Sequence, residues 1–457
     1  MTTKPPSGTR DFLPADIRRR EHVVGVVRRV YEQYGYEPLE TPAFENIETL
    51  LGKYGEEGNK LIFKILRRGE HEASGHADLA LRYDLTVPLA RVVAQYQNEL
   101  PKFFKRYQIQ PVWRADRPAR GRFREFYQCD IDAIGSTSPM VEVELLSAVS
   151  DVLETLGFHD FRVLLNHRRV LAGLLQTSGI PGHQHETALV ALDKLDKIGE
   201  SGVTSELATR GVQEFAASRL VETLKKILAS GPADQASATN RSRLGTLGTI
   251  FASTPYEAAA QELDEIVQMI ASTPAANRVF VEPFLARGLS YYTGAIMEIA
   301  VPDLAGSLGG GGRYDNLIGM FLGRDVPACG FSLGLERIIV VMTERGMFPG
   351  VVANGAADVM ISLWSADSRA DALTLAGELR RGGLRVDVYP EADKLGKQFK
   401  YASSRGFGYV TVVGDDERRA GTVTIKDMTT GHQDSVARAL AADHIRQRMT
   451  NAREDAR

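Results

Sequence analysis

The chain has 457 residues, of which 43% are hydrophobic and 25% charged, and its formal net charge is −3. This length favours two or three domains, and the composition excludes a disordered or fibrous protein. No run approaches the roughly 18 apolar residues of a membrane span, and the first residues, MTTKPPSGTRDFLP, lack the features of a signal or transit peptide. Two cysteines make neither a disulfide framework nor a zinc quartet, so we expect a cytoplasmic protein.

The first third of the chain alternates between helical and strand-like patterns. Apolar residues recur every three or four positions over residues 16–34, and Gly35 follows as a stop. From 79 to 135 the pattern changes to strands broken by polar turns. A helix is then predicted over 138–156, ended by Gly157.

The middle of the chain reads as an insertion. Residues 167–275 are rich in Ala, Leu, Glu and Lys with helical spacing. Strand patterns return at 279–282 and 295–301, followed by glycines and a helix from about Gly334. We therefore predict one site-bearing core made of residues 1–166 and 276–347, interrupted by a helical insertion.

The last quarter is predicted to be a separate domain. Residues 348–356, rich in Gly, Ala and Val, read as a linker. Residues 357–457 then alternate between strands and helices, which predicts a small α/β domain with a mostly parallel sheet. The expected strands are 359–363, 385–389, 408–413 and 422–426, and the expected helices are 369–381 and 397–404. The last dozen residues are charged, and we expect them to fray.

Common nucleotide and metal motifs do not explain this sequence. It has no GxxxxGK[ST] loop, and no GxGxxG lies between a strand and a helix. His183 and His185 lack a third ligand and are expected at the surface, so we predict no metal-ligating residue.

Three stretches nevertheless carry candidate site residues. In the first, Leu81–Pro88, strand alternation would place Arg82, Asp84 and Thr86 on one face. On its own this stretch fits a solvent-facing edge strand better than a site.

The second stretch pairs two strand-like arms, 104–114 and 125–134, around a basic loop. Five arginines fall within eleven residues, at positions 114, 117, 120, 122 and 124. Guanidinium groups suit phosphates because their rigid fork binds oxygens bidentately. On the returning arm Gln128, Asp130 and Asp132 share one face. A solvated hairpin with a basic tip is the alternative, but this separation of charges favours a site for a small polar ligand beside a polyphosphate.

The third stretch is dense in glycine, which lets the backbone approach a ligand closely. It comprises Arg287–Gly294 (RGLSYYTG), Gly309–Tyr314 (GGGGRY) and Gly330–Arg337 (GFSLGLER). Arg337 is expected in the first turn of a helix, where unpaired N–H groups favour an anion.

Together these residues resemble class II aminoacyl-tRNA synthetases. The arm, loop and arm from Arg114 to Gln128 resemble motif 2, Gly330–Arg337 resembles motif 3, and Glu40–Pro42 fits the motif 1 region used in dimerisation. The phrases GTRDFLP, LRYDLTVP, RGLSYYTG and GGGGRYD are similar to signatures of the histidyl branch. The resemblance covers nearly the whole chain and implies an α+β fold, with an antiparallel-sheet catalytic core, a helical insertion and a C-terminal α/β anticodon-binding domain.

The resemblance also implies roles for individual residues. Arg114, Arg287 and Arg337 would be catalytic and would bind ATP, with Phe126 stacked on adenine. The histidine-binding residues would be Asp84, Leu85, Thr86, Gln128, Asp132, Tyr291, Tyr292 and Tyr314. The resemblance further implies a homodimer that uses ATP and Mg²⁺ to form histidyl-adenylate and then loads tRNA(His). The family usually has Asp where this chain has Ser290.

Three alternatives remain at this stage. A catalytically inactive regulatory subunit of histidine biosynthesis shares the core but typically lacks the C-terminal module and catalytic arginines. A tRNA-sensing module would tolerate loss of the ATP-binding arginines, and a synthetase for another amino acid would lack the histidyl phrases. Basic residues of the C-terminal domain could contact tRNA phosphates or form a solvated face, and the two interpretations are about equal: Arg380, Arg381, Lys394, Lys397 and Lys400.

Overall fold

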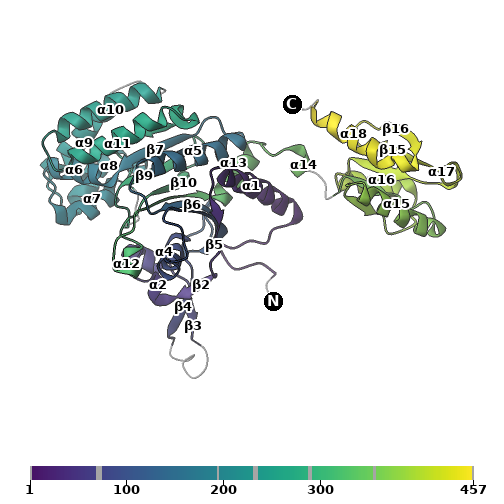
Figure 1. Ribbon diagram of the computed structural model, residues 1–457, viewed down its shortest axis with the longest axis horizontal. Helices are drawn as coiled ribbons and strands as arrows, with labels where there is room; N and C mark the ends of the chain where they lie inside the picture. The colour runs from purple at the N-terminus through teal and green to yellow at the C-terminus, as the bar shows by residue number, and fades with distance from the viewer. Residues whose placement is uncertain are drawn as a thin grey trace. The chain divides into compact units, whose positions relative to one another are not determined.

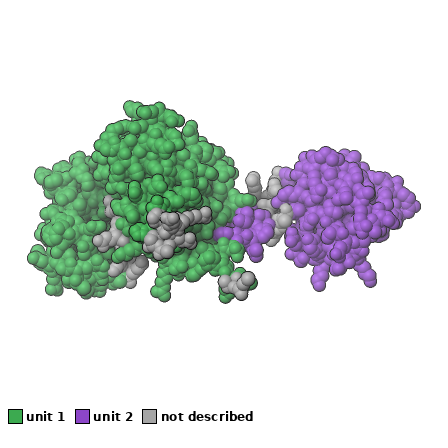
Figure 2. All heavy atoms as spheres, turned by 90° about the horizontal axis from the view of Figure 1, so that it is seen from below, with its two compact units in different colours: residues 1–11, 20–347 green, residues 12–19, 348–457 purple. Residues whose placement is uncertain are grey.

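The computed structural model describes residues 3–67, 75–192, 195–229, 235–286, 291–353 and 357–454 (Figure 1). The chain forms two compact units, one of residues 1–11 and 20–347 and the other of residues 12–19 and 348–457 (Figure 2). Within the described ranges, no helix combines the length and apolar character that a membrane crossing requires.

The first unit is built on an eight-stranded sheet. Its strands, in spatial order, are β1 (Glu37–Pro38), β5 (Phe104–Trp113), β6 (Glu125–Ile134), β11 (Ala328–Gly334), β10 (Ser307–Arg313), β9 (Ala295–Ala300), β7 (Arg162–His167) and β8 (Val279–Val281). The six inner strands pair antiparallel, whereas β1 and β8 pair parallel at the two edges. The predicted antiparallel core is therefore confirmed, and the two predicted arms are β5 and β6.

Helices cover this sheet where the spacing of apolar residues predicted them. They are α1 (Pro14–Gln33), α5 (Met140–Thr155) and α13 (Leu335–Glu344). The unit also contains two short elements that were not predicted, α12 (Gly319–Leu322) and the 3-10 turn η3 (Pro274–Asn277). Gly35 and Gly157, the predicted stops, adopt positive φ angles of 74° and 90°, which L residues with a side chain rarely tolerate. Helix α5 packs against β11, and α13 packs against β6.

The predicted strand over Leu81–Pro88 is wrong beyond its first residue. A small sheet of β2 (Phe44–Asn46), β4 (Ala77–Leu81) and β3 (Lys64–Leu66) ends at Leu81, near α2 (Ile47–Leu50) and α3 (Gly55–Lys60). Helix α4 (Thr86–Gln95) begins five residues later. The Asp84 carboxylate accepts a hydrogen bond from Val87 N at 3.0 Å, which satisfies a first-turn donor, and Pro88 is tolerated in that turn.

Arg82 does not share a solvent-facing strand surface with Asp84. Its side chain is almost fully buried, and Nη1 donates to Thr41 O at 2.7 Å and to Gln110 Oε1 at 2.9 Å. Nε donates to Pro111 O at 2.8 Å. Arg82 therefore ties the Thr41 region to β5 and has a structural function.

Between β7 and η3, the described residues contain only helices as regular elements. They are α6 (Arg168–Thr177), η2 (Gly182–Gln184), α7 (His185–Leu192), α8 (Leu195–Thr209), α9 (Glu214–Leu228), α10 (Ala236–Phe251) and α11 (Glu257–Ile270). Asn240 of α10 donates to Val279 O and accepts from Val281 N, both at 2.8 Å. This amide satisfies the open edge of β8, so α10 closes the sheet there.

The second unit has a five-stranded sheet in the order β13 (Val386–Val388), β12 (Val359–Ile361), β14 (Tyr409–Val412), β15 (Thr422–Asp427) and β16 (Gln433–Ala437). Its helical elements are α14 (Gly350–Ala353), η4 (Ala366–Ser368), α15 (Arg369–Arg381), α16 (Leu395–Ser404), α17 (Asp415–Ala420), η5 (Arg438–Leu440) and α18 (Ala441–Glu454).

Several sequence predictions for this unit need correction. Only β13, β12 and β14 are parallel, because β15 and β16 form an antiparallel extension. Strand β16 was not predicted, since its sequence QDSVA has little apolar alternation. The expected fraying at the end is wrong up to Glu454, where α18 ends. The predicted linker contains α14, while residues 354–356 lie outside the described part of the chain.

Candidate active site

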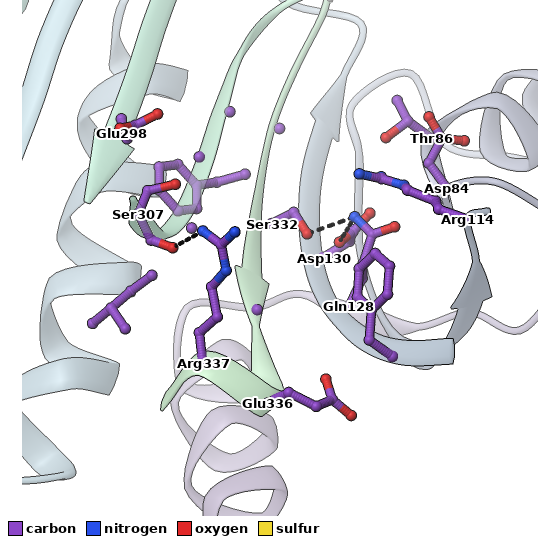
Figure 3. Close-up of a pocket in the computed structure, with 18 of the residues that line it drawn as sticks. Asp84, Thr86, Arg114, Gln128, Asp130, Glu298, Ser307, Ser332, Glu336 and Arg337 are labelled. Carbon is purple, nitrogen blue, oxygen red and sulfur yellow. Dashed lines mark hydrogen bonds between the residues drawn. The ribbon is translucent and has the colours of Figure 1, made fainter. Parts of the chain in front are cut away.

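A cavity of about 430 Å³ lies against the large sheet, with side chains from β6, β10, β11 and the start of α13 in its wall (Figure 3). Ten of the predicted site residues line it: Asp84, Thr86, Arg114, Phe126, Gln128, Asp132, Tyr291, Tyr292, Tyr314 and Arg337. Leu85 is fully buried behind this wall, and Arg287 and Ser290 lie outside the described residues. Candidate arginines, carboxylates and tyrosines from distant parts of the sequence thus share one cavity.

The floor of the cavity is a set of side chains in register across neighbouring strands. Asp130 of β6 is opposite Gln108 on β5 and Ser332 on β11. Gly310 of β10 continues the row beyond Ser332, and Glu298 of β9 ends it. Because these positions share one face of the pleated sheet, polar side chains from three strands, Asp130, Ser332 and Glu298, line the same cavity.

A second row explains the glycines that the sequence concentrates here. Asp132 is opposite Gly330, and a Cβ atom on Gly330 would lie 1.8 Å from Asp132 Oδ1. A Cβ on Gly312 would lie 2.8 Å from a ring carbon of Tyr292. Both separations are far below van der Waals contact, so only glycine leaves room for the carboxylate and the ring.

Asp132 is held by two buried partners. The Tyr314 hydroxyl donates to Oδ1 at 2.5 Å. Arg106 Nη2 lies 2.8 Å from Oδ2, an ion pair whose angle departs from hydrogen-bond geometry. Burial raises the pKa of Asp132, while Arg106 and the Tyr314 hydrogen bond oppose this rise. Tyr314, which the resemblance assigned to histidine binding, therefore also orients Asp132.

Arg106 connects this carboxylate to a predicted residue that does not reach the cavity. Its Nη2 also donates to the backbone oxygen of Leu85 at 3.4 Å. Leu85 is therefore linked to Asp132 only indirectly, because its backbone oxygen accepts from the arginine that pairs with Asp132. Sequence analysis missed Arg106, although its alternation with Gln108 and Gln110 on β5 places all three on one face.

Besides Asp132 Oδ2, which has only its ion pair with Arg106, two buried acceptor atoms at the cavity have no hydrogen-bond partner within the described structure. Asp84 Oδ1 accepts from Tyr54 at 2.9 Å and from Val87 N, but Oδ2 has no partner. Gln128 Nε2 donates to Ser332 Oγ at 2.8 Å, and Gln128 Oε1 has no partner. A buried acceptor without a donor costs about 1–3 kcal/mol, so both atoms fit a ligand that supplies N–H groups.

Two arginines line the cavity at different ends: Figure 3 shows Arg114 next to Asp84 and Thr86, and Arg337 next to Ser307. The Arg114 guanidinium lies over the rings of Tyr83 and Phe126, 4.3 and 5.2 Å from their centroids, and its Nε donates to Tyr83 O at 3.0 Å. Arg337, in the first turn of α13, donates from Nη1 to Ser307 O at 2.5 Å. The aromatic contacts and backbone hydrogen bonds orient both guanidiniums before an anion binds.

The basic loop between β5 and β6 only partly faces the cavity. Arg122 lines it and donates to Asp116 Oδ1 at 2.9 Å. Arg120 instead pairs with Glu344 at the end of α13, and Arg124 donates to Asp116 O at 3.1 Å. The density of arginines in the sequence predicted a basic cluster, but it did not show which of these side chains point into the cavity and which point away from it.

Glu336 is a further site residue that sequence analysis did not single out. It lines the cavity, and its carboxylate accepts from Tyr127 N at 2.9 Å and from Arg20 at 3.2 Å. Burial raises its pKa, and the Tyr127 hydrogen bond and Arg20 partly offset this. The Glu336 side chain joins α13 to β6 and so fixes the position of the neighbouring residue Arg337 relative to the cavity.

An antiparallel sheet with one arginine at the start of the loop between two paired strands, and another in the first turn of the helix that follows the adjacent strand β11, defines a class II aminoacyl-tRNA synthetase core. A family model described as histidyl-tRNA synthetase matches residues 8–338, and a model described as anticodon binding domain matches residues 356–448. The chain belongs to the histidyl-tRNA synthetase family.

Relatives agree over almost the full length. The chain is 42% identical to a histidine–tRNA ligase of Porphyromonas gingivalis, covering 94% of this chain and 95% of the relative. It is 40% identical to a histidine–tRNA ligase of Gloeobacter violaceus, covering 97% and 98%. The crystal structure of histidyl-tRNA synthetase from Nostoc sp. PCC 7120 is similar with a TM-score of 0.83 and 30% identity, covering 98% and 100%.

Proposed function

We propose that this protein is a histidine–tRNA ligase that activates L-histidine with ATP and transfers it to the 3′ end of tRNA(His). The observation that carries this proposal is the shared cavity. It combines Arg114 and Arg337, suited to a polyphosphate, with the two unpartnered acceptors Asp84 Oδ2 and Gln128 Oε1. An amino acid and a nucleotide would therefore lie side by side, as adenylate formation requires.

The amino end of histidine fits the unpartnered acceptors. An α-ammonium group has three N–H donors, and Asp84, Gln128 and the Thr86 hydroxyl line the cavity that would receive it. Pairing would remove the penalty of the two buried acceptors and would select for an α-amino group.

The imidazole end fits Asp132 and the tyrosines. Neutral imidazole has one N–H donor and one acceptor nitrogen. Asp132 would accept from the first, and the hydroxyl of Tyr292 would donate to the second. Tyr291 packs edge-on against Tyr292, with ring centroids 5.0 Å apart, and would form the wall. Tyr314, already donating to Asp132, would keep that carboxylate aimed at the ligand.

In the activation step, the histidine carboxylate attacks the α-phosphorus of ATP and pyrophosphate leaves. Arg114 and Arg337 would hold the phosphates, Phe126 would stack on adenine, and Arg287 would neutralise charge beside the α-phosphate. The ribose hydroxyl at the end of tRNA would then attack the acyl carbon of the adenylate, the bond from that carbon to the phosphate oxygen would break, and AMP would leave. We expect Arg287→Ala to lower adenylate formation far more than histidine affinity, because its role belongs to the transition state.

Mg²⁺ would accompany ATP as its counter-ion. The described residues contain no cluster of three or more His, Cys, Asp or Glu side chains that could hold a metal ion. Glu298 lines the cavity and lies beside Ser307 on the Arg337 side (Figure 3). Mg²⁺ in such sites is held mainly by substrate phosphates with one or two carboxylates, and a single Glu298 fits that pattern.

The domain roles follow from the family. Residues 1–166 and 276–347 would form the catalytic core, 167–275 the helical insertion, 348–356 the linker and 357–457 the anticodon-binding domain. Glu40–Pro42 would lie in the interface of a cytoplasmic homodimer. Phosphate contacts of the C-terminal domain would come from its basic residues, although Lys397 also pairs with Asp393 at 2.8 Å.

Amino-acid-dependent ATP–pyrophosphate exchange tests the proposal. Purified protein should catalyse exchange with L-histidine and not with the other nineteen amino acids. Exchange that requires a different amino acid, or none with histidine, would reject it.

A further inference from the structure

The side chain of Gln128 can present either of two different atoms to the cavity. Rotation of its amide by half a turn exchanges Oε1, an acceptor, with Nε2, a donor, at almost no steric cost. Only the orientation with Oε1 toward the ligand can accept from an ammonium group. Something next to Gln128 must therefore select this orientation.

Ser332 alone cannot make the selection. Gln128 Nε2 donates to Ser332 Oγ at 2.8 Å, but a hydroxyl can equally donate to an amide oxygen. The serine would accommodate the reversed amide by turning its own hydrogen.

Asp130 can make the selection, because an ionised carboxylate only accepts. Its Oδ1 lies 3.4 Å from Gln128 Nε2, and reversal would bring two acceptors face to face. The Ser332 hydroxyl also hydrogen-bonds the Asp130 carboxylate, so the serine oxygen is left to accept from Gln128. Asp130 is only 2% exposed, lies between Gln128 and Asp132 on β6, and has no role in the assignments above.

We propose that Asp130, acting with Ser332, is a positioning residue that orients the Gln128 amide and so gives the cavity its affinity for the α-amino group of histidine. This inference rests on the proposed function and deepens it. The carboxylate acts through Gln128 and Ser332 and need not touch the substrate.

Three ligands separate this role from a general loss of structure. Histidine carries both the amino and the carboxylate group, histidinol keeps the amino group only, and 3-(imidazol-4-yl)propionate keeps the carboxylate only. Their Kd values would be measured by calorimetry on the full chain at pH 8, because burial raises the pKa of Asp130 to about 7. At that pH the carboxylate is mostly ionised.

In the Asp130→Asn variant, the Kd of histidine and of histidinol should rise about 10- to 100-fold, the value of a hydrogen bond to a charged group. The Kd of imidazolepropionate should change less than about twofold. Ser332→Ala should weaken the same two ligands without altering the charge of the site. Ser147→Ala, which removes a buried hydroxyl bonded only to Val143 O on α5, is the matched control.

Equal weakening of all three ligands, or unchanged histidine binding in both variants, would overturn the inference. A loss in Asp130→Asn without any loss in Ser332→Ala would also overturn it, since charge rather than amide orientation would then be responsible. Wild-type protein that fails to bind histidine would overturn the proposed function, and the inference with it.

Discussion

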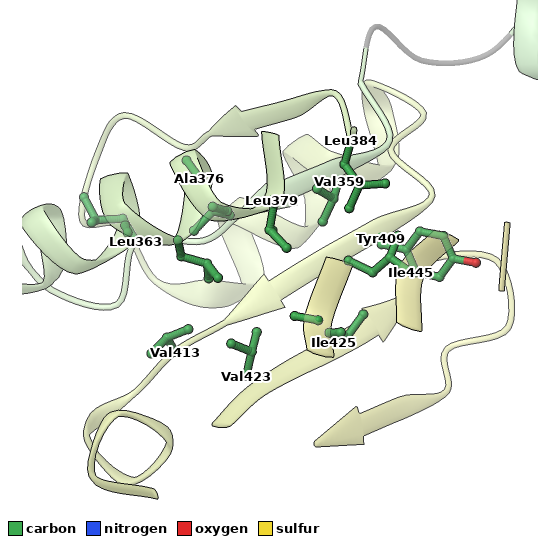
Figure 4. Close-up of a cluster of buried hydrophobic side chains, with 14 residues drawn as sticks. Val359, Leu363, Ala376, Leu379, Leu384, Tyr409, Val413, Val423, Ile425 and Ile445 are labelled. Carbon is green, nitrogen blue, oxygen red and sulfur yellow. The ribbon is translucent and has the colours of Figure 1, made fainter. Parts of the chain in front are cut away.

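The eight-stranded sheet of the first unit and the five-stranded sheet of the second unit bury different kinds of side chain. Strands β5 and β6 of the large sheet bury Arg106, Gln108, Asp130 and Asp132. The smaller sheet buries apolar residues on both faces, as Figure 4 shows for one of them. Along β12, Val359 and Ile361 belong to one apolar cluster and Met360 to the other.

The buried polar groups of the two units are also satisfied differently. In the second unit Gln398 is fully buried, but its amide accepts from Leu363 N and donates to Leu363 O, both at 2.9 Å. At the catalytic cavity, Asp84 and Gln128 each keep one acceptor without a partner. Thr411 Oγ1 on β14 of the second unit is also buried without a partner, so the two units differ in where such groups lie. Those of Asp84 and Gln128 line a cavity, where a substrate would complete them.

The largest expected effect comes from adding one methyl group to the floor of the cavity. Gly330→Ala places Cβ within bond-length range of Asp132 Oδ1, so the carboxylate must move. We expect histidine-dependent exchange to fall by about 100-fold or more, because a shift of about 1 Å in a site can cause such a loss. Circular dichroism would show whether the fold is kept.

Gly245→Ala is the control for that substitution. Its Cβ on α10 would meet no heavy atom within 4 Å, and alanine favours a helix by about 1 kcal/mol over glycine. Exchange activity should be unchanged. If Gly330→Ala were equally active, the position of Asp132 would not matter for activation.

A large change in the second unit should affect stability and leave activation intact. Leu375 of α15 is fully buried in the apolar cluster of Figure 4, and Leu375→Ala should lower the free energy of unfolding of this unit by about 2–5 kcal/mol. The chain has two tryptophans, so a Trp113→Phe background leaves Trp364 as the fluorescent probe of this unit in a urea titration. Histidine-dependent exchange should persist, and its loss would contradict the separation of tasks.

The smallest expected effect is a pH dependence of stability at the cavity. Burial, together with the neighbouring Asp132 and against the attraction of Arg106, raises the pKa of Asp130 from 3.8 to about 7. The folded state therefore holds this proton more tightly than the unfolded state. The protonated Asp130 therefore stabilises the folded state fully below about pH 4, and this stabilisation is lost as the pH rises through about 7.

Asp130→Asn should remove that dependence. Relative to wild type, the free energy of unfolding of the variant should increase between pH 5 and pH 8 by more than about 1 kcal/mol, although its histidine binding is weakened. Thermal unfolding at several pH values measures the difference. A constant difference across this range would show that Asp130 does not titrate with a raised pKa.

The local sequence was sufficient to predict the elements whose residue pattern is compatible with only one kind of secondary structure. Period-two alternation with a basic loop predicted β5 and β6 within one residue at each end. Apolar spacing and a following glycine predicted α1 and α5. The same alternation placed Gln128, Asp130 and Asp132 on one face, because successive side chains of a strand point to opposite sides.

Tertiary structure decided which groups meet and how they are paired. Leu81–Pro88 alternates like a strand, but Asp84 accepts from Val87 N and the chain turns into α4. Arg106, Tyr314 and Gly330 come from three strands or their ends. Only the register of these strands shows that Arg106 forms an ion pair with Asp132, that Tyr314 donates a hydrogen bond to it, and that Gly330 leaves space for it. Alternation specifies a face from neighbours in the chain, whereas partners across a sheet depend on strand order, which residues far apart in sequence determine together.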